Sequence, residues 1–237
     1  MIVRRQTRKI EIGTVPVGGG SPIAVQSMTN TDTRDVAATV AQIHALEKAG
    51  CELIRVAVLD LEAAAALTQI REAISIPLIA DIHFDHRLAV AAMENGAQAI
   101  RINPGNLGGP AKLARVVAAA KLHQVPIRVG VNSGSIEKDL LKVHGYPSPE
   151  NPAALIESAL RNVRLLEDLG FYEIKISIKS SDTLTTVSGY QALAKKTNYP
   201  LHLGVTEAGG LIAGTVKSSS LRLVSGHPEN AMSSSAD

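Results

Sequence analysis

The chain has 237 residues, of which 45% are hydrophobic and 3% aromatic, and its formal net charge is +2. This length suits one large domain or two small ones, and the weak net charge and scarce aromatic residues disfavour a nucleic-acid-binding protein. No apolar run approaches the roughly 20 residues of a membrane span, and no apolar stretch follows the basic N-terminus, so a cytoplasmic protein without a membrane partner is expected. The one cysteine, Cys51, predicts a core residue rather than a disulfide or metal site.

The hydrophobic pattern changes once near the N-terminus and then repeats. Residues 3–17 alternate around Gly13 and predict a β-hairpin, which a glycine-rich loop follows. From residue 23 onward, apolar strand patterns alternate with helical ones. Strands are predicted at 23–28, 53–58, 77–82, 97–103, 126–132, 172–179 and 200–206, and helices at 34–49, 60–73, 86–95, 110–122, 151–169 and 183–196.

This βα repetition indicates an α/β protein. No glycine-rich dinucleotide fingerprint follows the first strand, so a (β/α)8 TIM-type barrel is favoured over a doubly wound sheet. The barrel is predicted to be incomplete, because seven strands are recognisable and residues 220–237 have no strand run or helical period. We therefore divide the chain into a hairpin and loop (1–22), a barrel domain (23–219) and a disordered tail (220–237), and expect unpaired edges on the first and seventh strands.

Four of the predicted strands carry a cation in their C-terminal half or at their end. These residues are Arg55, Arg101, Arg128 and Lys179. A parallel barrel gathers such strand ends at one mouth, where four cations repel one another unless an anion lies between them. Arginine suits bidentate contact with a phosphate and lysine supplies a point charge. Lys175 shares the strand face of Lys179, but Lys179 is expected nearer the mouth and is preferred.

Two carboxylates accompany these cations. Asp81 and His83 share a strand face and could position hydroxyl groups or move protons, with a metal site as the alternative. Glu207 follows the seventh strand and is a candidate general acid, although a glutamate favoured by a helix dipole explains it equally well. Any one cation, in turn, could be a surface residue paired with a carboxylate.

The motifs around these residues resemble the 4-hydroxy-3-methylbut-2-enyl diphosphate synthase family of the non-mevalonate isoprenoid pathway. The resemblance spans about residues 4–219 and depends on VQSMTNTDT (25–33), ADIHFD (80–85), IRINPGN (100–106), IRVGVNSGS (127–135), KISIKSSD (175–182) and PLHLGVTEAGG (200–210). It implies a barrel that binds 2-C-methyl-D-erythritol 2,4-cyclodiphosphate. It further implies a separate domain whose three cysteines and one glutamate hold a [4Fe-4S] cluster, electrons from flavodoxin or ferredoxin, and a homodimer.

The resemblance also implies roles for individual residues. Arg55, Arg101, Arg128 and Lys179 would bind the diphosphate, and Asp81, Asn103 and Asn132 would contact the substrate. Glu207 would help to protonate the leaving hydroxyl. The family's eighth strand and cluster domain are not recognisable after about Ser219, and the tail reads like translation in a wrong frame. This chain alone is therefore expected to be inactive as an oxidoreductase.

Two other functions stay open at this point. The chain could be a non-catalytic module that binds a phosphate ligand in the same pocket. It could also be another phosphate-handling barrel, such as a pterin or aldolase-type enzyme, although neither a pterin motif nor a Schiff-base lysine context stands out.

Overall fold

The computed structural model describes residues 5–204 and 233–235. The N-terminal hairpin consists of β1 (Lys9–Ile12) and β2 (Val15–Gly18), which pair antiparallel with Ile12 opposite Val15. Gly13 takes the first position of the two-residue turn with φ +56°, a conformation that glycine adopts without strain. The predicted hairpin is confirmed.

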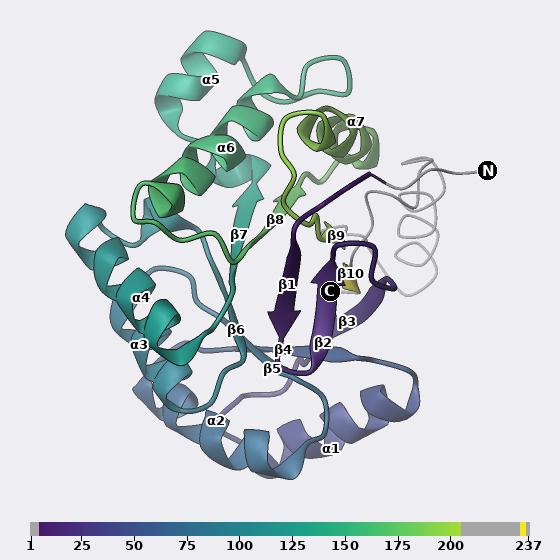
Figure 1. Cartoon of the computed structure of the whole chain (residues 1–237), viewed down its shortest axis with the longest axis vertical. Helices are drawn as coiled ribbons and strands as arrows, with labels where there is room; N and C mark the ends of the chain where they lie inside the picture. The colour runs from purple at the N-terminus through teal and green to yellow at the C-terminus, as the bar shows by residue number, and fades with distance from the viewer. Residues whose placement is uncertain (1–4, 205–232, 236–237) are drawn as a thin grey trace.

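Six parallel strands follow, each paired with the next in chain order. They are β3 (Ala24–Met28), β4 (Leu53–Ala57), β5 (Leu78–Asp81), β6 (Ala99–Ile102), β7 (Ile127–Asn132) and β8 (Ile174–Lys179). The main helices are α1 (Val36–Lys48), α2 (Leu61–Ala73), α3 (His86–Glu94), α4 (Pro110–His123), α6 (Ala153–Glu167) and α7 (Thr183–Ala194). They lie on the outside of the curled sheet (Figure 1). The predicted α/β barrel type is confirmed.

Within residues 200–204, the described part of the seventh predicted strand, the regular strand begins only at Leu203. The predicted strand 200–206 contributes β9 (Leu203–Gly204), and Leu201 forms an isolated parallel bridge with Ile176 of β8. Tyr190 of α7 strengthens this side, because its hydroxyl accepts a hydrogen bond from the Ile178 amide at 3.1 Å and donates one to the His202 carbonyl. A helix side chain therefore links two strands whose own ladder is short.

The tail differs from its prediction at three residues. The strand β10 (Ser233–Ser235) lies between β3 and β9 and pairs in parallel with both, so these strand edges are not left unpaired. Parallel pairing uses backbone N–H and C=O groups and needs no apolar side chains, so a run of serines gave no strand signal. The described strands are nevertheless shorter here than over β3–β8, since β10 has 3 residues and β9 has 2. All other residues of the predicted tail lie outside the described residues.

Alternation along the strands divides the side chains between two cores. The larger core lies between the sheet and the helices and includes Ile54, Ile100 and Ile176. The smaller core lies on the inner side of the sheet, where Ile10 and Ile12 of the hairpin pack with other buried residues. That set also contains Val17, Ala24, Leu53, Ile79 and Ala99. The hairpin therefore fills the inside of the sheet near the N-terminal ends of the strands (Figure 1).

Four of the helices begin with an aspartate directly after a strand-to-helix loop. Asp35, Asp60, Asp85 and Asp182 each accept a backbone N–H at the start of α1, α2, α3 and α7. A short helix, α5 (Lys138–His144), lies within the 133–150 insertion and had no predicted counterpart, since seven residues are too few for a periodic signal. Among the described helices, none is long and apolar enough to cross a membrane.

Candidate anion site inside the barrel

Four charged residues stand side by side in register across the sheet. Asp81 on β5 is opposite Arg101 on β6, Arg101 is opposite Arg128 on β7, and Arg128 is opposite Lys175 on β8. Their neighbours along each strand belong to the outer core against the helices. Because side chains alternate along a strand, this row of four points to the inner side of the sheet.

Asp81 holds two of the predicted cations. Arg101 donates a hydrogen bond from Nη1 to Oδ1 of Asp81 at 3.2 Å, and Nε of Arg55 lies 3.7 Å from Oδ2. His83 approaches the same carboxylate, with Nε2 3.8 Å from Oδ2. Burial would raise the pKa of Asp81, but the positive charges of Arg101 and Arg55 outweigh burial and hold that pKa below its usual value. Asp81 is therefore ionised and positions both arginines.

Arg128 of β7 and Lys179 of β8 lie farther along the sheet from Asp81. Nε of Arg128 donates a hydrogen bond to Oγ of Ser177 at 2.9 Å, which directs the guanidinium along β8. Lys179 ends β8 and is opposite Asn132, which ends β7. Both cations are buried, as are Arg55 and Arg101. The structure thus brings the four predicted cations onto one face of neighbouring strands.

The side chain of His202 lies within electrostatic range of several of these cations. Its side chain is completely buried, and Leu201 and Leu203 beside it face the outer core, so His202 points inward. Burial lowers the pKa of His202 well below its ordinary value, and the charges of Arg128, Lys175, Lys179 and Arg55 lower it further. The imidazole is therefore neutral at physiological pH. Sequence reasoning did not single out His202, because one histidine in an apolar strand is usually a core residue.

The buried charges do not balance. Among the described residues, the buried basic side chains are Arg55, Arg101, Arg128, Lys175 and Lys179, and the one buried acidic side chain is Asp81. Neighbouring strands lie ~4.8 Å apart, and two like charges ~5 Å apart repel by about 3 kcal/mol at an effective dielectric constant of ~20. An arrangement of this kind stores repulsion that an anionic ligand relieves.

Lys175 has a larger place in this site than the sequence suggested. The sequence favours Lys179 as the ligand-binding lysine, yet Lys175 is directly opposite Arg128 and only 2% exposed. Its Nζ has no hydrogen-bond partner within the described part of the chain. Both amide atoms of Gln26 on β3 share this condition. Strand register, which sequence periodicity cannot supply, decided this difference.

Gly130 makes room for one of the arginines. A Cβ atom added to Gly130 would overlap Nε of Arg101 and lie 3.0 Å from its Nη2. The guanidinium of Arg101 therefore passes directly over the backbone of β7. The glycine in the strand pattern IRVGVN was the available signal, since a glycine inside a strand often marks the close approach of another group.

The remaining predicted site residues are Asn103, Asn132 and Glu207, of which the structure describes the two asparagines. Asn103 follows β6 and is buried, and its Oδ1 has no partner among residues 5–204. Asn132 is only partly buried, and its backbone N–H donates to Oγ of Ser135 at 3.3 Å. Glu207 lies outside the described residues, so its predicted role as an acid is still untested.

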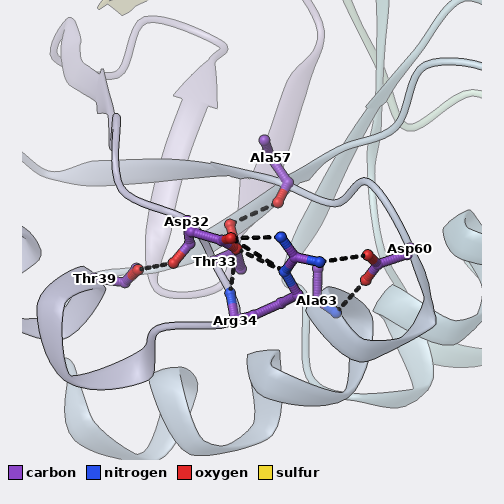
Figure 2. Close-up of polar contacts among 7 residues, drawn as sticks. All are labelled: Asp32, Thr33, Arg34, Thr39, Ala57, Asp60 and Ala63. Atoms are coloured by element: carbon purple, nitrogen blue, oxygen red, sulfur yellow. Dashed lines mark hydrogen bonds and ion pairs between the residues drawn. The ribbon is translucent and has the colours of Figure 1, made fainter.

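The loop after β3 is connected to the start of α2 at the same end of the sheet (Figure 2). Arg34 contacts Asp32 at 2.6 Å and Asp60 at 3.2 Å, while Asp60 also accepts the N–H of Ala63. Thr33 donates to the carbonyl of Ala57 at the end of β4 at 2.6 Å. These contacts hold residues 29–33 (TNTDT) against the carboxyl end of β4, the strand that carries Arg55.

The metal alternative at Asp81 and His83 gains no third ligand. Within the described ranges, no cluster of three or more His, Cys, Asp or Glu side chains could hold a metal ion. Cys51 is buried, and its Sγ lies 3.0 Å from the carbonyl oxygen of Leu53. Burial raises the pKa of this thiol above its ordinary value, which suits the predicted core residue.

Comparison with known proteins gives consistent results. The family model described as the GcpE TIM-barrel domain matches residues 7–223. A 4-hydroxy-3-methylbut-2-en-1-yl diphosphate synthase (flavodoxin) from Desulfotalea psychrophila is 71% identical over 219 residues, and one from Lawsonia intracellularis is 58% identical over the same length. Each alignment covers 92% of this chain and 60% of the relative. The chain thus spans about 60% of the length of these curated relatives.

Solved structures share the fold at low sequence identity. Dihydropteroate synthase from Xanthomonas albilineans matches with a TM-score of 0.67 and 12% identity, covering 97% of this chain and 92% of that one. Type I 3-dehydroquinate dehydratase from Clostridium difficile matches with a TM-score of 0.67 and 14% identity, covering 98% and 90%. At such identities these similarities establish the barrel fold alone.

Proposed function

We propose, from the premise that this chain belongs to the GcpE TIM-barrel domain family, that its barrel binds a compact cyclic diphosphate. The observation that carries the proposal is the buried excess of basic side chains, five against one carboxylate in the described residues, three of them arginines that stay charged. The ligand best suited to it is 2-C-methyl-D-erythritol 2,4-cyclodiphosphate. The curated relatives of this chain are synthases whose product is the corresponding open-chain diphosphate.

Each residue would act through its charge and its position. Arg55 and Arg101, held by Asp81, would present guanidinium groups to one phosphoryl group, and Arg128 with Lys179 would contact the other. Asn103 directly follows β6 and Asn132 ends β7, so both lie at the carboxyl ends of their strands and would supply amide groups to the ligand. Glu207, which follows β9 in sequence, would protonate the leaving hydroxyl.

The complete reaction would be a reductive opening of the cyclic diphosphate with loss of water. Two electrons would come from flavodoxin or ferredoxin, and the first of these is consistent with the names of the relatives. The [4Fe-4S] cluster implied by the family needs three cysteine ligands, whereas this chain has one cysteine, whose sulfur is buried at β4. The residues of this chain do not fit the cluster, so no redox step is assigned to them.

Calorimetric titration of the purified chain with the cyclodiphosphate tests the proposal. Binding to the wild type is expected, and replacing Arg128 by Gln should weaken it by about 10- to 100-fold, because a charge-assisted hydrogen bond contributes about 1.5–3 kcal/mol. The exposed Arg115 on α4 gives the matched control, since Arg115→Gln should leave the affinity unchanged. A folded chain that does not bind the cyclodiphosphate would contradict the proposal.

A non-catalytic phosphate-binding module is the second candidate, favoured by the single cysteine. The two candidates differ in turnover rather than in binding. If the part of the Desulfotalea psychrophila relative that this chain does not match is added in trans with reduced flavodoxin, turnover would favour a synthase barrel. Binding without turnover would favour the module.

A further inference from the structure

Lys175 is a buried lysine whose amine has no hydrogen-bonded counter-charge within the described part of the chain. Its Nζ is enclosed on the inner side of β8 and has no hydrogen-bond partner among the described residues. Asp81, the carboxylate of the row, contacts Arg101 and Arg55 instead. An ammonium ion in such a place pays the cost of dehydration without compensation, whereas a neutral amine does not.

The groups around Lys175 oppose its protonation. Arg128 is directly across from it on β7, Arg55 lies on β4, and both charges reach its amine. His202, directly before β9, is within electrostatic range of Lys175 and is neutral. Burial lowers the pKa of Lys175 well below its ordinary value, and the charges of Arg128 and Arg55 lower it further.

A bound anion would favour the protonated form of Lys175. A dianion held by the arginines adds negative charge beside Nζ and offers it phosphoryl oxygens as hydrogen-bond acceptors, and only the protonated amine can donate three hydrogen bonds to them. We propose that Lys175 is a further ligand-binding residue that takes up one proton from solvent when the dianion binds, so that anion binding is coupled to protonation inside the barrel. One N–H bond forms on the lone pair of Nζ, and the buffer acid loses the proton.

This inference rests on the proposed function and makes it more specific. It distinguishes the two lysines of β8, because Lys179 ends the strand beside Asn132 whereas Lys175 lies four residues earlier, beside Arg128. The protonation state of Lys175 would depend on the charge of the bound ligand, and the contribution of Lys175 to binding affinity would depend on pH.

Calorimetric titration in two buffers of different ionisation enthalpy measures the proton directly. The cyclodiphosphate is a suitable probe because both of its phosphoryl groups are diester-like and keep a fixed charge near neutral pH, and sulfate serves as a second non-titrating dianion. The wild-type chain should take up about one proton per bound anion, and its affinity should rise ~10-fold for each unit that the pH falls within the window of uptake. Lys175→Met should abolish the uptake, flatten this pH dependence and weaken binding.

Two variants serve as controls for the site of protonation. Lys179→Met should weaken binding but retain the uptake, and His202→Gln should also retain it. Uptake that persists in Lys175→Met and disappears in His202→Gln would overturn the proposal in favour of the histidine. Anion binding with no uptake in the wild type would overturn it as well and leave the proposed function intact, whereas no anion binding at all would contradict the proposed function itself.

Stability gives a readout that needs no ligand. Since the folded-state pKa of Lys175 is depressed, the unfolded chain binds an extra proton below the usual lysine pKa of 10.5, and stability should rise as the pH increases toward that value. Lys175→Met should raise Tm near neutral pH and remove this slope, because methionine fills the space without an amine. A lower Tm in Lys175→Met would show instead that Lys175 is a charged structural residue.

Discussion

The guanidinium group of Arg101 lies over the backbone of Gly130 on the neighbouring strand, so closely that a Cβ atom on Gly130 would overlap it. From this position Arg101 reaches Asp81 on its other side at 3.2 Å. The missing side chain on β7 is thus as much a part of the site as the arginine on β6. The side chain of Arg101 therefore lies on the inner side of the sheet, in the space that Gly130 leaves open.

Gly130→Ala should therefore damage the anion site without breaking the strand. The methyl group would push Arg101 away from Asp81 and weaken binding of the cyclodiphosphate by about 10-fold or more, the effect of losing one charge-assisted hydrogen bond. Titration calorimetry measures it. Gly134, which has open space around its Cβ position and no positive φ, provides the control Gly134→Ala. Unaltered affinity in Gly130→Ala would contradict the assigned role of Arg101.

Asp81→Asn should destabilise the chain and change its response to anions. Removing one partner of a buried ion pair typically costs about 3–5 kcal/mol, because the remaining charge is left uncompensated. Because the variant has one negative charge fewer beside Arg55 and Arg101, the anion should raise its Tm more than that of the wild type. Thermal melts with and without the cyclodiphosphate check both expectations. An equal shift in the two proteins would argue against direct coupling between Asp81 and the ligand.

The pH dependence of Asp81 has a definite sign. Its folded-state pKa lies below the usual 3.8, so its contribution to stability is present above that value and is lost as the pH falls through the folded pKa. Wild type and Asp81→Asn should therefore become more alike in stability in strong acid. Melting curves recorded from neutral pH downward would show this convergence.

Ile12→Ala tests the hairpin that fills the inside of the sheet. Ile12 is 1% exposed and packs in the inner core with Leu53, Ile79 and Ala99. An isoleucine-to-alanine change in such a core costs about 2–5 kcal/mol. Leu122→Ala on α4, where the side chain is 78% exposed, should change stability by no more than about 0.5 kcal/mol. Denaturant unfolding of the two variants gives the comparison, and equal stabilities would mean that the hairpin does not support the barrel.

Glu47→Gln should remove part of the acid sensitivity of the fold. Glu47 of α1 accepts hydrogen bonds from the N–H groups of Ser75 and Ile76 and from Oγ of Ser75, which joins α1 to the segment between α2 and β5. Burial would raise the pKa of Glu47, but hydrogen bonds from His44 and Ser75 outweigh it and lower the pKa to about 2. Its contribution is therefore present above pH 4.5 and is lost between about pH 4.5 and 2.

The loss at neutral pH should be about 1.5–3 kcal/mol, since charge-assisted hydrogen bonds are replaced by neutral ones. Asp32→Asn is the contrasting variant. The pKa of Asp32 is also lowered to about 2, by hydrogen bonds from Arg34, but both side chains are exposed and salt screens their attraction. In high salt Asp32→Asn should melt like the wild type while Glu47→Gln does not. Similar behaviour of the two variants would show that the Glu47 contacts are no stronger than a surface ion pair.

The amino-acid sequence by itself determined the order of strands and helices, the cations on the strands and the family. These features come from local periodicity and residue type, and the predicted strand that ends at Asn132 coincides with β7. It missed α5, which is too short for a helical period, and the strand at Ser233–Ser235, which depends on backbone hydrogen bonds that side chains do not reveal.

Tertiary structure alone decided which charges meet. Register places Lys175 beside Arg128, brings His202 among the cations, and lets Arg101 cross Gly130 to reach Asp81. None of these relationships follows from spacing along one strand, because a shift in pairing between strands would change every neighbour while leaving each pattern intact. Burial then shifts the pKa values of Asp81, Lys175 and His202, because neighbouring charges interact strongly where water is excluded.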